Sequence, residues 1–458
     1  MLPPVSNTGS DQDAQELARA LAWLGEFTDW EQLKPTHGRP FPFGLERMDA
    51  LLQALGNPQR ARPAIHITGT KGKSSTSNFA AAILTAHGVK TLRYISPHVE
   101  SVTERIATDG ANISGAEFAS LADQLRPYVN AVRSARPELV PTFFEAITAI
   151  AFLHALRAEA SVLEVGLGGR LDATNVVVPV ASVITSIGLD HTMVLGTTHA
   201  AIAAEKAGIV KPCVPVLVGL RPDDPGFATI AEHAERKNSP LFHAGRDFQL
   251  TRTTLLTQDG APPRLVFDGT AAGTRVSNFN IAAGAPHQAM NALLAIAAAE
   301  LLLRSMGRSL DVDVTRDALA ATALPARAEW FAGDPPILLD GAHTAESVAA
   351  LALLAQTLAA GRPVHALVGL TVDREPNSVF GGLAACASVT ATTVPGPRGI
   401  QADALATSLG CAGVSDPLEA LTALRARARG GLILITGSLY LAGVLRSALT
   451  QEPRRPLS

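Results

Sequence analysis

Cysteine, aromatic side chains and charge are all scarce in this sequence, and each scarcity excludes something. The 458 residues include 3 cysteines, Cys213, Cys386 and Cys411, whose wide spacing fits no metal-ligand pattern and which we expect to be reduced thiols. Charged residues make up 17% of the chain and the net charge is −3, without a block of lysine and arginine that would indicate a nucleic-acid surface. We therefore expect a protein that does not bind nucleic acid.

Long apolar runs and a secretion signal are also missing. The apolar stretch Ala292–Leu303 is rich in alanine and too short to span a bilayer. The polar start Met1–Glu16 lacks the basic and apolar regions of a signal peptide. These features predict a soluble, cytoplasmic protein without a membrane partner. With 47% hydrophobic and 5% aromatic residues, its core must be built from alanine, leucine, valine and isoleucine, and the length predicts two or three domains.

The distribution of apolar residues predicts an α/β fold. Short, wholly apolar segments bounded by glycine or proline are typical of buried parallel strands, and here they alternate with segments of helical periodicity. The helices predicted in the first part of the chain cover 13–24, 43–55, 74–87, 142–157 and 286–306. The strands predicted there cover 64–68, 161–165, 181–187 and 214–218, and residues 242–279 are expected to form a few antiparallel strands.

A polar break at 307–313 precedes a second, smaller α/β region, with strands predicted over 337–339, 364–370, 389–394 and 432–436. We place the domain boundary there, with residues 1–308 in the first domain and 309–458 in the second. The expected architecture is a P-loop-type parallel-sheet ATPase domain with a small antiparallel subdomain, followed by a Rossmann-like α/β domain. The tail, 451–458, is expected to be disordered.

One motif has a clear chemical meaning, a glycine-rich turn between the strand at 64–68 and the helix at 74–87. It reads Gly69-Thr70-Lys71-Gly72-Lys73-Ser74-Ser75. Backbone N–H groups in such a turn bind a phosphate chain, Lys73 can reach the outer phosphates, and the serine hydroxyls can cap the helix or meet metal-bound phosphate. The first glycine of the full P-loop pattern is absent. The alternative, a turn that only begins a helix, explains Gly-Lys-Ser after an apolar strand less well.

Two further side chains have positions suited to metal binding. Glu145 lies near the start of a predicted helix, where an acid can also serve only to favour the helix dipole. His191 follows Asp190 at the end of an apolar strand, where ligands gather in open α/β sheets, although a lone histidine there is more often structural. The glycines at 166–169 do not complete a dinucleotide fingerprint, because Leu171 occupies its last glycine position.

The order of the short motifs resembles that of the Mur ligase superfamily, and most closely the folylpolyglutamate synthase and dihydrofolate synthase family. Each segment is weak alone, but their shared order is highly specific. The similar segments are Gly44–Met48, Leu55–Pro58, Ile67–Ser75, Ser96–His98, Glu104–Ile106, Thr142–Glu145, Glu164–Asn175, Gly188–Thr192, Glu205–Ile209, His287–Gln288, Asn291–Ala292, Pro325–Glu329, Asp340–His343 and Thr436–Tyr440.

This resemblance implies an enzyme that uses ATP and magnesium, with two magnesium ions expected and potassium as a candidate further ion. Ser96, Glu145 and His191 would hold the magnesium. The lysine that matches Lys206 is carbamylated in the superfamily, which turns a cation into an anionic oxygen ligand; the alternative is a lysine on a solvated helix face. The implied catalytic residues are Lys73, Lys206 and His343.

The resemblance also assigns binding residues and a monomeric state. The nucleotide residues that it implies, besides the glycine-rich turn from Gly69 to Ser75, are Asn291, Arg327 and Asp340. The substrate residues that it implies are Arg170 and Asp172 for the pterin end of a folate-type carboxylate, and His343 and Ser438 for L-glutamate.

The sequence departs from the family's pattern in several places. Lys71 replaces an asparagine and Ser74 a glycine in the nucleotide loop, and Ala326 replaces a glycine before Arg327. Thr344 and Ala345 stand where Asn-Pro is usual, and His287 where a glycine is usual. These changes concern the choice of substrate more than the type of reaction.

The favoured hypothesis is ligation of L-glutamate to dihydropteroate or a reduced folate through an acyl phosphate. The alternatives are a diverged ligase of the superfamily that acts on another carboxylate or amino acid, a nucleotide-binding protein without catalysis, and a P-loop phosphotransferase. The presence of every implied catalytic and metal residue disfavours the loss of catalysis, and a separate amino-acid domain disfavours the phosphotransferase. The preferred pterin and the number of glutamates added remain open.

Overall fold

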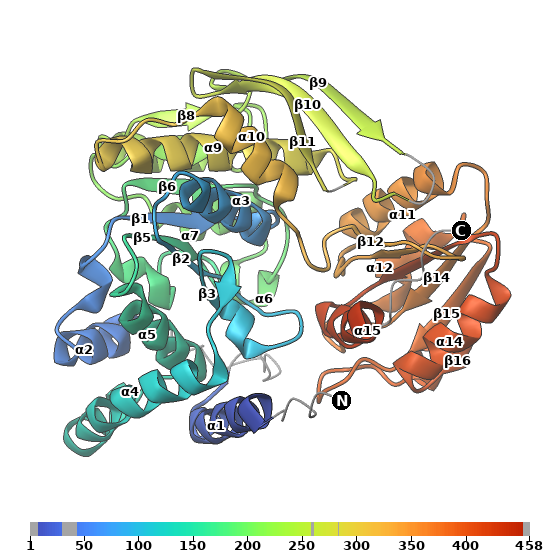
Figure 1. Cartoon of the computed structure of the whole chain (residues 1–458), viewed down its shortest axis with the longest axis horizontal. Helices are drawn as coiled ribbons and strands as arrows, with labels where there is room; N and C mark the ends of the chain where they lie inside the picture. The colour runs from blue at the N-terminus through green and yellow to red at the C-terminus, as the bar shows by residue number, and fades with distance from the viewer. Residues whose placement is uncertain (1–7, 30–43, 258–260, 283, 452–458) are drawn as a thin grey trace, which may run out of the picture. The chain divides into compact units, whose positions relative to one another are not determined.

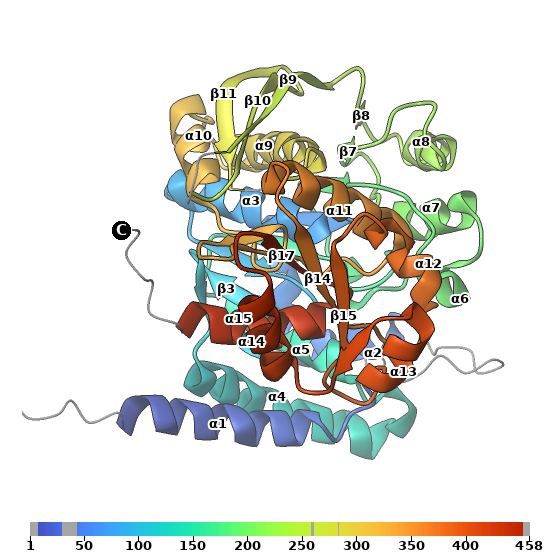
Figure 2. The same ribbon diagram turned by 90° about the vertical axis from the view of Figure 1, so that its right-hand side faces the viewer.

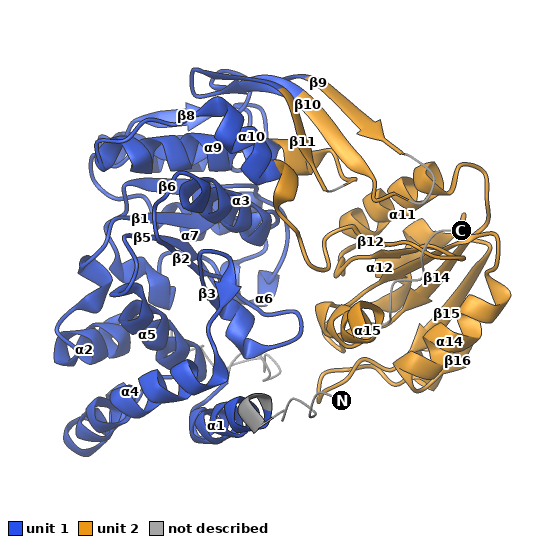
Figure 3. Ribbon diagram, in the orientation of Figure 1, with its two compact units in different colours: residues 1–251, 268–277, 290–319 blue, residues 252–267, 278–289, 320–458 orange. Residues whose placement is uncertain are grey.

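The computed structural model describes residues 8–29, 44–257, 261–282 and 284–451, which divide into two compact units (Figure 3). The expected disordered tail lies outside the described residues except for Gln451. Unit 1 comprises Met1–Thr251, Asp268–Ser277 and Met290–Leu319; unit 2 comprises Arg252–Phe267, Asn278–Ala289 and Ala320–Ser458. Within the described residues, no helix is both long and apolar enough to cross a bilayer.

Unit 1 is built on an eight-stranded sheet with the order β4-β3-β2-β5-β1-β6-β7-β8 (Figure 1). Neighbouring strands from β2 to β8 run parallel, whereas β3 and β4 form an antiparallel edge. The strands are β1 (Ala64–Thr68), β2 (Thr91–Tyr94), β3 (Ile106–Thr108), β4 (Ala111–Asn112), β5 (Ala160–Glu164), β6 (Ala181–Ile184), β7 (Val216–Val218) and β8 (Leu241–His243). β1 and β5 are buried along their whole length, which explains why most of their residues are apolar.

Helices cover both faces of this sheet, with α3 on one face and α4 and α5 on the other (Figures 1 and 2). The helices of this part are α1 (Thr8–Leu24), α2 (Glu46–Ala54), α3 (Lys73–Ala86), α4 (Gly115–Ala135), α5 (Phe143–Ala155), α6 (Thr192–Leu195), α7 (His199–Ala207), α8 (Phe227–Arg236), α9 (His287–Ser305) and α10 (Val312–Ala321). Thr142 begins α5 as half of a capping box with Glu145, and Thr198 caps α7.

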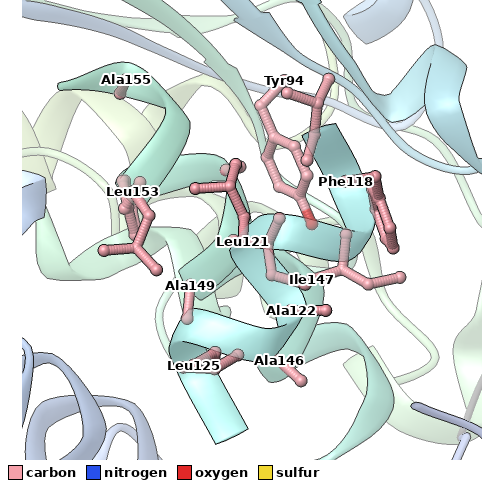
Figure 4. Packing of buried hydrophobic residues seen from close by; sticks show 14 of the residues in the cluster. Tyr94, Phe118, Leu121, Ala122, Leu125, Ala146, Ile147, Ala149, Leu153 and Ala155 are labelled. Atoms are coloured by element: carbon pink, nitrogen blue, oxygen red, sulfur yellow. The ribbon is translucent and has the colours of Figure 1, made fainter. Parts of the chain in front are cut away.

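One core cluster of unit 1 joins α4 and α5 to strand β2 (Figure 4). Alanines of α5 such as Ala146 and Ala149 are fully buried, so the helices approach closely. Tyr94 is also fully buried, and its hydroxyl pairs with Thr148 Oγ1 at 2.9 Å, so this polar group is satisfied inside the core. Most of this cluster consists of alanine, leucine, valine and isoleucine, as the composition predicts, and buried aromatic rings such as Tyr94 and Phe118 complete it.

A three-stranded sheet with the order β11-β10-β9 contains the division between the two units. Its strands are β9 (Phe248–Leu256), β10 (Arg264–Ala271) and β11 (Thr274–Ile281). A two-residue turn at Ala272-Gly273 joins β10 and β11, and such a short connection requires antiparallel neighbours. The β10–β11 hairpin overlaps the region 242–279, where the sequence predicts antiparallel strands.

Unit 2 contains a six-stranded sheet with the order β12-β13-β17-β14-β15-β16, parallel except for β12 at its edge. Figure 1 shows α11 on one face and α14 and α15 on the other. Its elements are β12 (Glu329–Phe331), β13 (Ile337–Leu339), α11 (Ala345–Ala359), β14 (Val364–Val368), α12 (Pro376–Phe380), β15 (Ser388–Thr392), α13 (Ala402–Leu409), β16 (Ala412–Val414), α14 (Pro417–Arg427), β17 (Leu432–Thr436) and α15 (Leu439–Gln451). The α/β fold class predicted from the sequence is confirmed.

Candidate active site

The carboxyl ends of four neighbouring parallel strands, β2, β5, β1 and β6, lie side by side at one edge of the unit 1 sheet. Each strand ends at, or is followed within a few residues by, a residue with relevant chemistry. Ser96 follows β2, Glu164 ends β5, Gly69 follows β1, and Asp190 lies in the segment after β6. The topology thus gathers, on one edge, residues that are far apart in the sequence, as ligand sites of open α/β sheets require.

The glycine-rich turn that follows β1 is held in a shape that only glycine allows at two points. Gly69 has φ +152° and Gly72 has φ +88° immediately before α3. A Cβ atom on Gly69 would lie 1.8 Å from Thr185 Oγ1, and one on Gly72 would lie 2.5 Å from Asn291 Oδ1. The turn is therefore packed against Asn291, one of the predicted nucleotide residues, and leads directly to the N-terminus of α3.

Hydrogen bonds tie this turn to the segment after β6. The N–H of Thr70 donates to the Ser186 carbonyl at 2.9 Å, and the N–H of Lys71 donates to Ser186 Oγ at 2.9 Å. Lys73 Nζ donates to the Gly69 carbonyl at 3.1 Å, which holds its ammonium group over the turn. Ser75 is buried in α3. The turn is thus fixed, and Lys73 has the position of a phosphate-binding cation.

Two buried carboxylates of this edge are bonded by side chains of the turn. Lys71 Nζ lies 2.9 Å from Asp190 Oδ2, and Asp190 Oδ1 accepts the N–H of His191 at 2.9 Å. Ser74 Oγ donates to Glu164 Oε1 at 2.9 Å. Both departures from the family's loop pattern, the lysine and the serine, therefore contact an acidic group.

Lys206, on α7, shares a small pocket with the glycine-rich turn. Residues that line this pocket include Gly69, Lys73, Gly166, Asp190, His191 and Lys206. Lys206 is buried, and burial, reinforced by the positive charge of Lys73, lowers its pKa to about 7. Within the described part of the chain, Lys206 Nζ has no hydrogen bond or ion pair. A large fraction of this amine is therefore neutral near pH 7, which is the form that reacts with electrophiles.

Glu145, the predicted carboxylate ligand, has other partners. Arg47 Nε lies 2.9 Å from Glu145 Oε2 and Arg47 Nη2 lies 2.9 Å from Glu145 Oε1. Glu145 Oε2 also accepts the N–H of Thr142 at 2.8 Å as part of the capping box of α5. Arg47 thus contacts both carboxylate oxygens, and Oε2 also caps the helix.

Glu164 is the acidic residue that the sequence reasoning missed. It is 1% exposed and lies at the carboxyl edge of the sheet, between the ends of β2 and β1 in the strand order. The signal was present in the sequence, because Glu164 interrupts the apolar segment predicted as the strand 161–165. A charged residue in an otherwise apolar strand needs a partner or a ligand, and that requirement would have singled it out.

Arg170 and Asp172, predicted to face the substrate, both contact protein groups: Arg170 contacts helix α7 and Asp172 contacts its own loop. Arg170 Nη2 lies 2.8 Å from Glu205 Oε1 of α7. Asp172 is buried and its two oxygens accept the N–H groups of Leu167 and Thr174 at 3.0 Å each. Burial raises the pKa of Asp172, although these hydrogen bonds oppose the rise. Asp172 therefore fixes the loop, while the exposed Arg170 side chain remains open to solvent on part of its surface.

The remaining predicted residues lie in unit 2, at the carboxyl ends of the neighbouring strands β13 and β17. Asp340 follows β13, and its two oxygens accept the N–H groups of Ala328 and Ala342 at 2.7 Å each. Burial raises the pKa of Asp340, and the nearby positive charge of Arg327 opposes this rise.

The same edge of unit 2 carries the predicted amino-acid-binding residues. His343 Nδ1 is 2.8 Å from the Gly341 carbonyl, so this ring nitrogen is the donor and the contact fixes the orientation of the ring. Ser438 follows β17, is buried, and accepts the N–H of Tyr440 at 3.2 Å. Asp340 and Ser438 thus follow two neighbouring strands at the carboxyl edge of the unit 2 sheet.

The donor set in unit 1 fits a magnesium ion bound together with a nucleotide. Glu164 offers a carboxylate, Ser96 a hydroxyl and His191 an imidazole at the ends of β5, β2 and β6. Among the residues that the structure describes, no cluster of three or more histidine, cysteine or acidic side chains could hold a metal by itself. Magnesium commonly retains waters and binds substrate phosphates with only one or two carboxylates, so this sparse set suits it.

The chain matches two family models. Residues 67–299 match the Mur ligase middle domain, and residues 326–439 match the Mur ligase glutamate ligase domain. The fold and the two polar edges therefore define a Mur ligase, an ATP-dependent class of enzyme.

Individual relatives narrow this class. The folylpolyglutamate synthase of Lacticaseibacillus casei is 33% identical over 88% of this chain and 94% of that protein. The dihydrofolate synthase/folylpolyglutamate synthase of Bacillus subtilis (strain 168) is 31% identical over 89% of this chain and 95% of that protein. The structure of Mycobacterium tuberculosis folylpolyglutamate synthase complexed with ADP and AMPPCP is similar with a TM-score of 0.85 at 28% identity, over 96% of this chain and 100% of that chain. The chain belongs to the folylpolyglutamate synthase and dihydrofolate synthase family.

Proposed function

We propose that this chain is an ATP- and magnesium-dependent ligase that joins L-glutamate to a folate-type carboxylate, dihydropteroate or a reduced folate. The observation that carries the proposal is the carboxyl edge of the unit 1 sheet, where the glycine-rich turn, Lys73, His191 and Lys206 line one pocket. The family relationship and the names of the relatives support the choice of substrate.

The reaction that this arrangement suits has two steps. A carboxylate oxygen of the folate-type substrate attacks the γ-phosphorus of ATP, which gives an acyl phosphate and ADP. The glutamate amine then attacks the acyl carbon, loses a proton and expels inorganic phosphate, so that an amide forms. Lys73 stabilises the negative charge that develops on the transferred phosphoryl group, and bound magnesium supplies further charge neutralisation there.

The metal ligands that we propose are Ser96, Glu164 and His191. Glu164 takes the place that the sequence suggested for Glu145, because both oxygens of Glu145 are used by Arg47 and by a helix cap. Glu164 lies at the carboxyl edge beside the turn. Titrating the purified protein with magnesium and with potassium would determine how many ions bind and whether potassium has a role.

Lys206 is proposed to act as its carbamate. A neutral amine is needed for reaction with CO2, and burial together with Lys73 lowers the pKa of Lys206 to about 7. The carbamate converts this cationic side chain into an anionic oxygen ligand, which suits a hard metal ion. Its charge would also be balanced by Lys73, which lines the same pocket.

Unit 2 is proposed to supply the amino-acid end of the reaction, in a domain that we place at 309–458 after a nucleotide domain at 1–308. His343 and Ser438 are proposed to bind L-glutamate, and Arg327 and Asp340 the nucleotide. The hydrogen bonds that Asp340 and His343 make to neighbouring backbone groups support this role, because they fix the direction of each side chain before a ligand arrives.

The deciding experiment measures ADP release by the purified full chain with ATP and magnesium, with dihydropteroate or a reduced folate, and with or without L-glutamate. We expect glutamate-dependent turnover and a product heavier by one glutamyl unit, and the better acceptor distinguishes a dihydrofolate synthase from a polyglutamylase. Lys73→Ala is the inactive control. Nucleotide binding without turnover on either acceptor would contradict the proposed substrates and favour a ligase for another carboxylate.

A further inference from the structure

Two side chains of the glycine-rich turn contact the acidic groups of the proposed metal region. Lys71 Nζ is 2.9 Å from Asp190 Oδ2, and the Asp190 carboxylate is 6% exposed. Ser74 Oγ is 2.9 Å from Glu164 Oε1, and Glu164 is 1% exposed. Carboxylates buried to this degree are costly unless they are paired or hydrogen bonded, so each of these contacts offsets part of that cost.

The position of the two donors makes the contacts relevant to ligand binding. Lys71 and Ser74 belong to the turn that is proposed to hold the phosphates, whereas Asp190 and Glu164 belong to the sheet edge beside it. A magnesium ion at this edge would bring two positive charges close to the Lys71 ammonium group, and it would compete with the Ser74 hydroxyl for the oxygens of Glu164. Metal binding and these two contacts therefore oppose each other.

We propose that Lys71 and Ser74 are internal placeholders for the magnesium ion: they neutralise and hydrogen bond Asp190 and Glu164 before the metal binds, and they give up these contacts when magnesium and nucleotide arrive. Lys71, with 41% of its side chain exposed, has room to turn from Asp190 towards a phosphate. These contacts should stabilise the ligand-free protein. They should also raise the magnesium concentration needed for nucleotide binding above that of a chain without them. This inference rests on the proposed nucleotide and magnesium site.

The test compares Lys71→Asn and Ser74→Ala with the wild-type chain. The affinity for ADP is measured by isothermal titration calorimetry across a series of free magnesium concentrations, and the melting temperature is measured in magnesium-free buffer. Lys71→Asn removes one positive charge near the metal, so we expect half-maximal enhancement of ADP binding at a magnesium concentration lower by about fivefold. Ser74→Ala should lower it by about twofold, because only a hydrogen bond is removed. Both variants should melt at a lower temperature without ligand.

Two control variants separate the local contact of Lys71 from the size of its side chain and from the net charge of the protein. Lys71→Arg keeps the charge and should retain the wild-type magnesium requirement. Lys237→Asn removes an exposed lysine at the end of α8 and tests for an effect of net charge alone. An unchanged or increased magnesium requirement in Lys71→Asn would overturn the proposal and would identify Lys71 as a phosphate ligand only. Because the assay measures binding and needs no folate or glutamate, its result is independent of whether the proposed ligase reaction is correct.

Discussion

Replacing glutamate by glutamine should lower the stability of the protein at Glu145 but weaken magnesium binding at Glu164. In Glu145→Gln, the Arg47 guanidinium, only 16% exposed, loses the carboxylate that it contacts with two nitrogens. Breaking a largely buried pair costs up to 3–5 kcal/mol, and the partial exposure of Arg47 and the cap that glutamine can retain reduce this to about 2–3 kcal/mol. At roughly 2–4 °C per kcal/mol, the melting temperature should fall by about 4–12 °C. The magnesium requirement should stay unchanged.

Glu164→Gln should act on metal binding instead. Its hydrogen bond from Ser74 can be kept by the amide oxygen, so little stability is lost, whereas the negative charge that attracts magnesium disappears. We expect at least about a tenfold rise in the magnesium concentration needed for ADP binding. The assays are thermal unfolding and calorimetric titration of ADP at graded magnesium. The reasoning is refuted if Glu145→Gln raises the magnesium requirement while Glu164→Gln leaves it unchanged.

Three further predictions concern other parts of the two edges. Since the pKa of Lys206 is lowered to about 7, the neutral amine should grow from about a tenth at pH 6 to about nine tenths at pH 8. Carbamate formation at a fixed CO2 concentration, followed by 13C NMR with labelled CO2, should therefore rise through this range, and a flat profile would contradict it. Gly72→Ala would place a Cβ atom 2.5 Å from Asn291 Oδ1 and should weaken ADP binding more than about tenfold. Gly110→Ala, at a similar φ of +82° with open space around it, should cost only about 1 kcal/mol in unfolding and leave binding intact. Asp340→Asn can accept only one of two buried backbone N–H groups and should destabilise the chain by about 1–3 kcal/mol in thermal unfolding.

Several parallel strands could be predicted because they are short apolar segments bounded by glycine or proline. The segment 64–68 was predicted to the residue, and β17 likewise, since each is mostly apolar and buried along its length. β2 was missed because Arg93 interrupts its apolar character, although the strand is central in the sheet. The helix α4 was also missed, and it contains Pro127, which argues against a continuous helix when only the sequence is read.

The candidate site was predictable where a motif carries its own geometry, and less so where partners come from far along the chain. The glycine-rich turn combines a strand, two glycines and a helix start within a dozen residues. By contrast, an acid at a helix start is equally suited to capping and to metal binding, and the partner that decides for Glu145 is Arg47, 98 residues earlier. The contact between Lys71 and Asp190 spans 119 residues and could not be inferred from either segment alone.

Both sheets carry candidate site residues at the carboxyl ends of parallel strands, but the two edges differ in their charged groups. The edge of unit 1 gathers charged groups, with Lys71 and Lys73 beside Asp190 and with Lys206 buried nearby, so its charge balance must change when phosphate and metal arrive. The edge of unit 2 instead fixes Asp340 by backbone hydrogen bonds that already satisfy it. Variants at the first edge should therefore respond strongly to magnesium and ionic strength, whereas variants at the second should act mainly through the geometry and stability of the loop that they hold.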